Sequence, residues 1–336
     1  MKRCRIVALV AMPAMMSGCA GVQSAMGGDG VQGARFADLF LWFTGVCLIV
    51  YLLVIGGLVM AVVRGWRSRR SGRDEQGHDA AIQPIFALWV ALISLILIGL
   101  TFASYFTDRA FASDGGKRPA VTIDLTANQW WWDIKYQGAN PSEQIRTANE
   151  LHLPVGRLVH INLRSNDVIH SFWIPNLAGK QDLIPGRDID IALLPTRSGV
   201  FRGQCAEYCG TQHAHMALDV VVESPAAFDA WRRRQLAPAA PPPPGLATAG
   251  QVYFTGRECS TCHAVAGTSA SASVGPDLTH LASRRSIAAG TFPMTSGHLY
   301  AWVADPQGAK PGNHMPVIGL QPRELDTVVA YLSTLQ

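Results

Sequence analysis

The residues with the clearest chemical capability lie in one short run, CAEYCGTQHAHM. Its two cysteines are four positions apart, a histidine follows after four more, and a methionine after another three: Cys205, Cys209, His213 and Met216. A second imidazole, His170 in the sequence HSFWIP, stands at the end of an expected strand. Two thiolates, two imidazoles and a thioether form a soft ligand set that suits copper. Zinc binds the first four donors but makes little use of a thioether.

A disulfide is the alternative for these cysteines, because disulfides persist in exported proteins. A bridge between Cys205 and Cys209 would leave His170, His213 and Met216 unexplained.

The second reactive run is CSTCH, residues 259–263. The pattern C-x-x-C-H is typical of covalent haem c attachment. Cys259 and Cys262 are expected to form thioethers, and His263 to bind the iron from one side. By itself the motif also fits a metal or redox pair.

Two long hydrophobic segments precede these motifs. We expect transmembrane helices over residues 39–63 and 84–107, because each apolar run exceeds the roughly 20 residues that cross a bilayer. The connecting segment, residues 64–79, holds five arginines, so it is expected to be cytoplasmic. Both flanking parts of the chain then face the periplasmic or extracellular side of a bacterial plasma membrane.

The N-terminus has the features of an export signal. A basic start and an apolar stretch predict a signal peptide over residues 1–18. Cys19 follows Met-Ser-Gly, which resembles a lipoprotein cleavage box; acylation of Cys19 and ordinary cleavage further on both remain open.

The rest of the chain divides into two domains. Residues 118–230 alternate apolar and polar positions between turn signals, which predicts an all-β, antiparallel sandwich or barrel. Residues 231–247 are a Pro-rich linker. Residues 248–336 show helical periodicity and predict an all-α domain.

Taken together, the copper-type motif, the two spans and the β domain resemble subunit II of the haem-copper oxidases. The resemblance implies a cupredoxin-like sandwich with a dinuclear copper centre, in which Cys205 and Cys209 bridge two ions. His170 and His213 would each bind one ion, Met216 would be a weak ligand, and Glu207 would contribute its backbone carbonyl.

The same resemblance implies three further roles. The Glu207 side chain would bind magnesium or manganese at the interface with the catalytic subunit. In the run QWWW, residues 129–132, we predict Trp130 as the point where electrons reach the copper domain. Asp182 and Arg187, in QDLIPGRDID, are hypothesised to belong to the subunit interface or proton-exit region.

The C-terminal segment resembles a class I cytochrome c, since CSTCH is followed by GPDL and by KPGNHMP. Motif order then predicts Met315 as the second iron ligand, with Met294 as the rival. Methionine opposite histidine suits electron transfer rather than oxygen binding.

The resemblance implies a function in respiration. The chain would receive electrons from an external cytochrome or other one-electron donor. It would pass them through haem c and copper to a separate oxygen-reducing subunit I. A subunit III is expected as a further partner, in a complex that translocates protons. The chain is then part of an enzyme and not catalytic alone. Its net charge of +4, with no dense basic face, gives no reason to expect nucleic acid.

Two alternatives belong to other classes. One is a membrane-anchored copper delivery or redox-sensing protein, against which Glu207, Met216 and the haem motif argue. The other is the corresponding subunit of a nitric oxide reductase, which differs only in the partner's substrate. One position departs from the family: Gln83 or Pro84, with Asp79 nearby, stands where a glutamate is common at the mouth of a proton channel.

Overall fold

The computed structural model describes residues 21–70, 79–115 and 118–336. The predicted signal peptide and Cys19 therefore lie outside the described residues, as does most of the arginine-rich loop beyond residue 70. The chain divides into two units, one of residues 35–116 and one that combines the N-terminal segment with residues 117–336.

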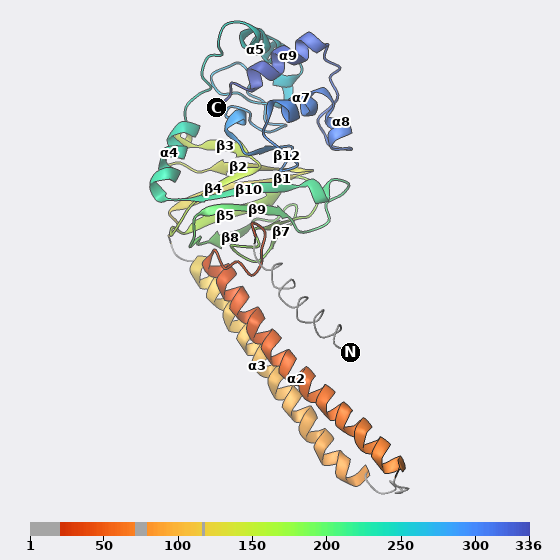
Figure 1. Ribbon diagram of the computed structural model, residues 1–336. Coiled ribbons are helices and arrows are strands. Elements are labelled where there is room, and N and C mark those ends of the chain that lie inside the picture. Colours follow the sequence, from red (N-terminus) through yellow and green to blue (C-terminus); the bar gives the residue numbers. More distant parts are fainter. Residues whose placement is uncertain (1–20, 71–78, 116–117) are drawn as a thin grey trace, which may run out of the picture. The chain divides into compact units, whose positions relative to one another are not determined.

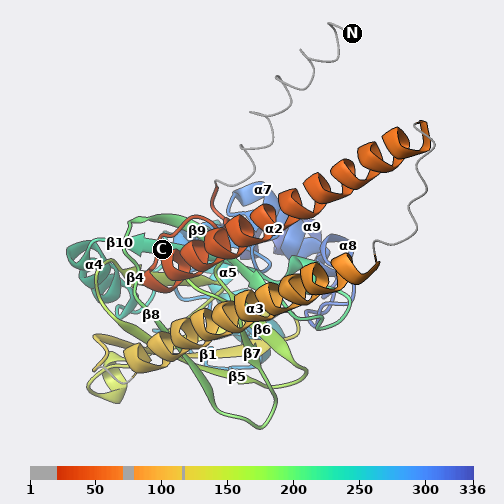
Figure 2. The same ribbon diagram turned by 90° about the horizontal axis from the view of Figure 1, so that it is seen from below.

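The smaller unit consists of two long helices, α2 (Val31–Arg70) and α3 (Asp79–Gly115), which run antiparallel in Figures 1 and 2. Both are long and apolar enough to cross a membrane, with mean hydropathies of 3.0 and 2.6 in their most apolar windows. Their apolar side chains are exposed, as expected for helices whose surroundings are lipid. Pro84 lies inside α3, in its second turn, and so removes one backbone hydrogen bond of that helix.

The larger unit contains a sandwich of two five-stranded sheets, in the order β3-β2-β1-β5-β8 and β4-β10-β9-β6-β7. The strands of the first sheet are β1 (Val121–Asn128), β2 (Trp131–Tyr136), β3 (Ile145–Ala148), β5 (Val159–Ser165) and β8 (Ile189–Leu193). Those of the second are β4 (Glu150–Pro154), β6 (His170–Trp173), β7 (Gln181–Leu183), β9 (Gly199–Cys205) and β10 (Ala217–Glu223).

Alternation along the strands explains the sandwich. In β1 every second residue is buried, which places one face of the strand toward the other sheet. The core between the sheets includes Ile123, Leu125, Trp132, Ile161 and Phe172, each at most 1% exposed. The predicted all-β fold is thus confirmed.

The prediction of purely antiparallel sheets was wrong. β1 pairs in parallel with β5, and β10 pairs in parallel with β4. After β3 the chain crosses to the second sheet as β4, and then returns to the first sheet as β5. Parallel neighbours need such a crossover, because a tight hairpin joins only antiparallel strands.

The sandwich also binds the described N-terminal segment. Gly30 forms a β-bridge with Pro195, and the buried Asp29 carboxylate accepts from Asn176 Nδ2 (2.8 Å) and pairs with Arg197 (2.5 Å). A Cβ at Gly30 would lie 2.5 Å from the Leu177 carbonyl oxygen, so only glycine permits this approach.

The segment between the sandwich and the C-terminal domain is shorter than expected. Helix α4 (Pro225–Gln235) continues past the expected domain end at residue 230, because Trp231 and Phe228 bury their rings in the sandwich core. Helix α5 begins at Leu246, so residues 236–245 connect the two domains.

The C-terminal domain is helical, as the sequence predicts, with one added two-stranded pair. Its elements are α5 (Leu246–Gly256), α6 (Cys259–Cys262), β11 (Ser286–Ile287), β12 (Phe292–Pro293), α7 (Ser296–Ala304), α8 (Pro306–Ala309) and α9 (Pro322–Leu332). Helices α5 and α9 pack closely: a Cβ at Gly250 would lie 1.9 Å from the Thr327 carbonyl oxygen.

Candidate metal and haem sites

The structure brings together the five soft donors of the sandwich, His170, Cys205, Cys209, His213 and Met216, which we name the Cys/His/Met cluster. His170 begins β6, and Cys205 ends β9. The loop that follows, residues 205–216, contains a short 3-10 helix, η3 (His213–His215), and leads into β10. Adjacent strands β6 and β9 thus fix two donors, and one short loop supplies the other three.

The donor atoms of the cluster face one another. Cys205 Sγ lies 3.7 Å from Cys209 Sγ and 3.8 Å from His170 Nδ1. Cys209 Sγ lies 3.6 Å from His213 Nδ1 and 3.9 Å from Met216 Sδ. Cys205 Sγ also lies 3.2 Å from the Glu207 carbonyl oxygen. Each thiol therefore has its own imidazole, and the two sulfurs form the centre of the arrangement.

These sulfurs do not form a disulfide in this structure, because 3.7 Å greatly exceeds the S–S bond length of about 2.05 Å. Hydrogen bonding between the thiols lowers the pKa of Cys205, and the same contact raises the pKa of Cys209. Thiolate is the form that binds metals. The chemistry and convergence of the donors fit a soft metal centre.

Asp167 fixes the orientation of one ligand candidate, and the sequence analysis missed it. Its Oδ1 lies 2.7 Å from His170 Nε2, which leaves His170 Nδ1 directed at Cys205. A carboxylate behind a ligating histidine is a recurrent feature of metal sites. The only signal in the sequence is its position three residues before His170.

The Glu207 side chain points away from the cluster. Its Oε1 accepts from the Tyr208 N–H at 3.1 Å, and its Oε2 lies 3.7 Å from Lys180 Nζ, with the side chain 44% exposed. Lys180 also lies 3.8 Å from Asp182, whereas Arg187 is exposed. Asp182 is thus close to Glu207 through their shared neighbour Lys180.

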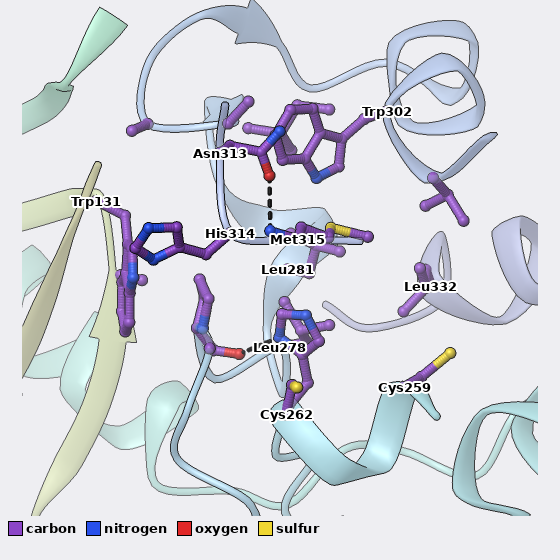
Figure 3. A pocket seen from close by; sticks show the side chains of 18 of the residues that line it. Trp131, Cys259, Cys262, Leu278, Leu281, Trp302, Asn313, His314, Met315 and Leu332 are labelled. Carbon is purple, nitrogen blue, oxygen red and sulfur yellow. Dashed lines mark hydrogen bonds between the residues drawn. The ribbon is translucent and has the colours of Figure 1, made fainter. Parts of the chain in front are cut away.

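A second site is an apolar pocket of about 250 Å³, lined mainly by the C-terminal domain and on one side by the sandwich. Its lining includes both cysteines and the histidine of the CSTCH motif, together with Trp302 and Met315. Figure 3 shows Cys259 and Cys262 at one side of this pocket and Met315 across it.

His263 is oriented for binding a metal through one ring nitrogen. Its Nδ1 donates to the Pro276 carbonyl at 2.7 Å, so Nε2 is left for a ligand. Burial lowers the pKa of His263, which favours the neutral imidazole that ligation requires. A Cβ at Gly275 would lie 2.8 Å from the His263 ring, so glycine allows the close approach.

Met315 and Met294 are separated by the structure. Met315 lines the pocket; its N–H donates to Asn313 Oδ1 (2.7 Å), and its carbonyl accepts from Gln307 Nε2 (2.8 Å). Met294 packs against the hydrophobic core and does not line this pocket. The observations favour Met315 as the axial candidate.

The two sites meet at Trp130. Its side chain is buried, Nε1 donates to the Cys209 carbonyl at 3.0 Å, and its ring centre lies 5.8 Å from that of His314. Figure 3 shows the His314 side chain directed toward the neighbouring Trp131. The resemblance implies aromatic residues on the surface, but here the C-terminal domain covers Trp130. The sequence analysis gave His314 no specific role.

Lys310 is a further residue that sequence reasoning missed. It is 2% exposed, and its ammonium donates to the carbonyls of Trp130, His215 and Ala288. Burial lowers the pKa of Lys310 to about 7. Lys310 is the first residue of KPGNHMP, but its distant acceptors could not be read from the sequence.

Comparison with known proteins gives matches over both domains. Residues 138–224 match the family "Cytochrome C oxidase subunit II, periplasmic domain", and residues 247–336 match "Cytochrome c". Cytochrome c oxidase subunit 2 of Alkalihalophilus pseudofirmus is 30% identical, over 99% of this chain and 97% of that protein. The Bacillus subtilis protein of the same name is 28% identical, over 100% of this chain and 98% of its own.

Among solved structures, the periplasmic domain of cytochrome oxidase subunit II from Bradyrhizobium japonicum is 28% identical, with a TM-score of 0.33. That match covers 35% of this chain and 95% of the solved one. The near-full-length similarity to the Alkalihalophilus protein, together with the two family matches, is decisive. This chain belongs to the cytochrome c oxidase subunit II family and has a cytochrome c domain at its C-terminus.

Proposed function

We propose that this chain receives electrons for a terminal cytochrome c oxidase and delivers them to an oxygen-reducing subunit I, in a complex that couples the reaction to proton translocation. The observation that carries this proposal is the convergence of two thiols, two imidazole Nδ1 atoms and a thioether on one buried centre. Bound copper and haem c supply reversible one-electron chemistry. The protein supplies ligands, orientation and exclusion of water.

In the Cys/His/Met cluster, we assign Cys205 and Cys209 as bridging ligands of a dinuclear copper centre. His170 and His213 would bind one ion each, because their Nδ1 atoms face different sulfurs. The Met216 thioether and the Glu207 carbonyl complete the set. Since all these donors are protein atoms on a rigid sandwich, the site suits electron transfer, in which ligands should move little.

We also propose the exposed Glu207 carboxylate as a ligand for magnesium or manganese at the interface with subunit I. Carboxylate oxygen suits both ions. The position of Glu207 outside the cluster supports this proposal, since its side chain is accessible to a partner. Other ligands would come from that partner.

In the C-terminal domain, we propose covalent haem c attachment at Cys259 and Cys262, with His263 and Met315 as axial ligands. The free Nε2 of His263 and the pocket-lining position of Met315 support these roles. The largely apolar pocket excludes water, and a methionine ligand raises the reduction potential.

We propose Trp130 as the residue through which electrons reach the copper domain. Its hydrogen bond to the Cys209 carbonyl and its ring contact with His314 support that role. Because Trp130 is covered, the external donor would meet the haem domain rather than Trp130 itself.

The location that we propose is a bacterial plasma membrane. Helices α2 and α3 would cross the lipid, and both redox domains would face the periplasmic or extracellular side. Subunits I and III and an external one-electron donor are the proposed partners.

The first test is the metal content of the full-length chain, matured with haem and purified in detergent. We expect two coppers and one iron per chain. The variant Cys205→Ser should lose copper and keep iron, and Cys259→Ala with Cys262→Ala should lose covalent haem. One copper per chain, or zinc in its place, would instead favour a delivery or sensing protein. The terminal substrate is tested by comparing the rates at which the purified complex consumes oxygen and nitric oxide.

A further inference from the structure

The Lys310 side chain connects three separate segments through one ammonium group. It follows α8, and its Nζ donates to the Trp130 carbonyl at 3.0 Å, the His215 carbonyl at 2.8 Å and the Ala288 carbonyl at 3.1 Å. Trp130 lies in the turn before β2, and His215 in the 205–216 loop. Ala288 belongs to the C-terminal domain, between β11 and β12.

The three acceptors match the three protons of the ammonium. Hydrogen bonds with a charged donor are stronger than neutral ones, and a buried amine without them would be costly. Lys310 forms no ion pair with a carboxylate of the described residues, so these three carbonyls hold its ammonium group. Their arrangement also satisfies the carbonyl oxygens of three segments at once.

Neighbouring contacts connect the same loops. Gln212 Nε2 donates to the Pro311 carbonyl at 2.7 Å, directly after Lys310. Four residues after Lys310, His314 packs on Trp130, whose Nε1 donates to the Cys209 carbonyl. The segment 310–316 therefore contains both the attachment to the 205–216 loop and the axial candidate Met315.

We propose that Lys310 is a positioning residue that fixes the 310–316 loop on the 205–216 loop and so keeps His314 against Trp130. This inference rests on the proposed function, because the two loops matter for electron transfer only if they bind haem and copper. Lys310 itself undergoes no covalent or redox change. Its contribution is a fixed separation between the two sites, on which the rate of electron transfer depends steeply.

The test uses the variant Lys310→Met in the full-length chain with haem and copper bound. Methionine is unbranched and similar in length to the apolar stem of lysine, but it has no hydrogen-bond donors. Lys135→Met is the matched control, because Lys135 is exposed on β2 and its replacement removes the same charge. Both variants are compared with the parent chain by amide hydrogen exchange and by the rate of internal electron transfer after photoreduction of the haem.

For Lys310→Met we expect exchange in segments 212–216 and 310–316 to be at least about tenfold faster, because three hydrogen bonds to a charged donor are lost. Internal electron transfer should slow by about ten- to a hundredfold, as expected for a misplaced reacting group. The copper and haem spectra of Lys310→Met should be those of the parent chain. The control Lys135→Met should match the parent in hydrogen exchange and in electron-transfer rate. A residue that only stabilised the fold would lower the melting temperature without slowing internal electron transfer at temperatures well below melting.

Parental exchange and parental electron-transfer rates in Lys310→Met would overturn the proposal. If that variant does not mature, Gln212→Ala removes the adjacent hydrogen bond to Pro311, together with the Gln212 contact to His215. Faster exchange in segment 310–316 of this variant then supports the proposal, and unchanged exchange overturns it. Metal content of the parent chain separates this result from failure of the proposed function, because hydrogen exchange reports the loop contact whether or not two coppers are bound.

Discussion

Asp167 illustrates how a residue outside the ligand set controls it. The carboxylate accepts from the backbone N–H of Val168 at 2.7 Å, which fixes its own position, and it holds His170 Nε2. Burial opposes its charge, but the hydrogen bonds to His170, Val168 and Gln129 lower the pKa of Asp167. A charged carboxylate behind the imidazole makes the opposite nitrogen a better ligand.

We therefore predict that Asp167→Asn weakens copper binding by about 10–100-fold. Titration of the metal-depleted full-length chain with copper measures this change. Asp188→Asn is the control, because Asp188 is exposed and pairs only with the exposed Arg164 in the described contacts. Equal copper affinities for the two variants would contradict a role for Asp167.

The two methionines of the C-terminal domain make a second comparison. Met315→Ala should remove a thioether from the haem iron and lower the reduction potential, because a methionine ligand raises it. Met294→Ala should leave the haem spectrum and potential unchanged and lower stability by less than about 2 kcal/mol, because its side chain is only partly buried. Redox titration and thermal unfolding distinguish these outcomes; a changed spectrum in the Met294 variant alone would reverse the assignment.

At the scale of elements, a buried histidine joins the sandwich strands. His152 on β4 lies 3.0 Å from Glu150 and 2.8 Å from Glu223 on β10, and its ring stacks on Trp231 of α4 with centres 4.2 Å apart. The Tyr136 hydroxyl accepts from the His152 N–H at 2.7 Å. The Glu150 carboxylate also accepts from the Arg285 N–H of the C-terminal domain at 2.7 Å.

The stability that this cluster contributes is lost both at high pH, through His152, and at low pH, through Glu150. Burial opposes the His152 cation, but hydrogen bonds to Glu150 and Glu223 raise the pKa of His152 above 6.5. Its contribution is complete below 6.5 and is lost as pH rises through the higher folded-state pKa. Burial also opposes the Glu150 anion, but His152 and Arg285 lower its pKa below 4.5, so its contribution is complete above 4.5 and is lost as pH falls through the lower folded-state pKa.

We expect His152→Gln to destabilise the chain by about 1–3 kcal/mol below pH 6.5, because charged hydrogen bonds are lost. The difference from the parent should shrink at higher pH. Denaturant unfolding across this range measures it, with His160→Gln as control, since His160 pairs at the surface with Asp190. A destabilisation that is independent of pH would show that packing on Trp231 dominates.

At the scale of the whole molecule, α2 and α3 determine which side of a membrane the remaining chain occupies. Arginine accumulates in the last turn of α2, at Arg67, Arg69 and Arg70. Short loops rich in arginine remain cytoplasmic. The sandwich and the C-terminal domain follow α3, so they should lie on the opposite side.

Impermeant maleimide labelling of spheroplasts tests this topology. Lys135→Cys, on the exposed face of β2, should be labelled at once, whereas Arg70→Cys should react only after permeabilisation. The parent chain supplies the background from its own cysteines, of which Cys47 is exposed on α2. Immediate labelling of the Arg70 variant would contradict the proposed orientation.

The sequence by itself determined the parts whose chemistry is local. The CSTCH motif, the spacing within residues 205–216 and the two apolar helices all depend on residues close together in the chain. The same holds for β1, whose alternation is visible along eight residues. Such patterns are fixed by side-chain type and backbone period, so no knowledge of distant packing is needed.

Only the tertiary structure decided which distant residues meet. Lys310 reaches the Trp130 carbonyl from 180 positions away, and the Arg285 N–H reaches the Glu150 carboxylate from 135 positions away. The parallel pairing of β1 with β5 likewise depends on the chain crossing between sheets. These contacts arise because packing of whole elements brings their ends together, and the spacing of residues along the sequence carries no information about that packing.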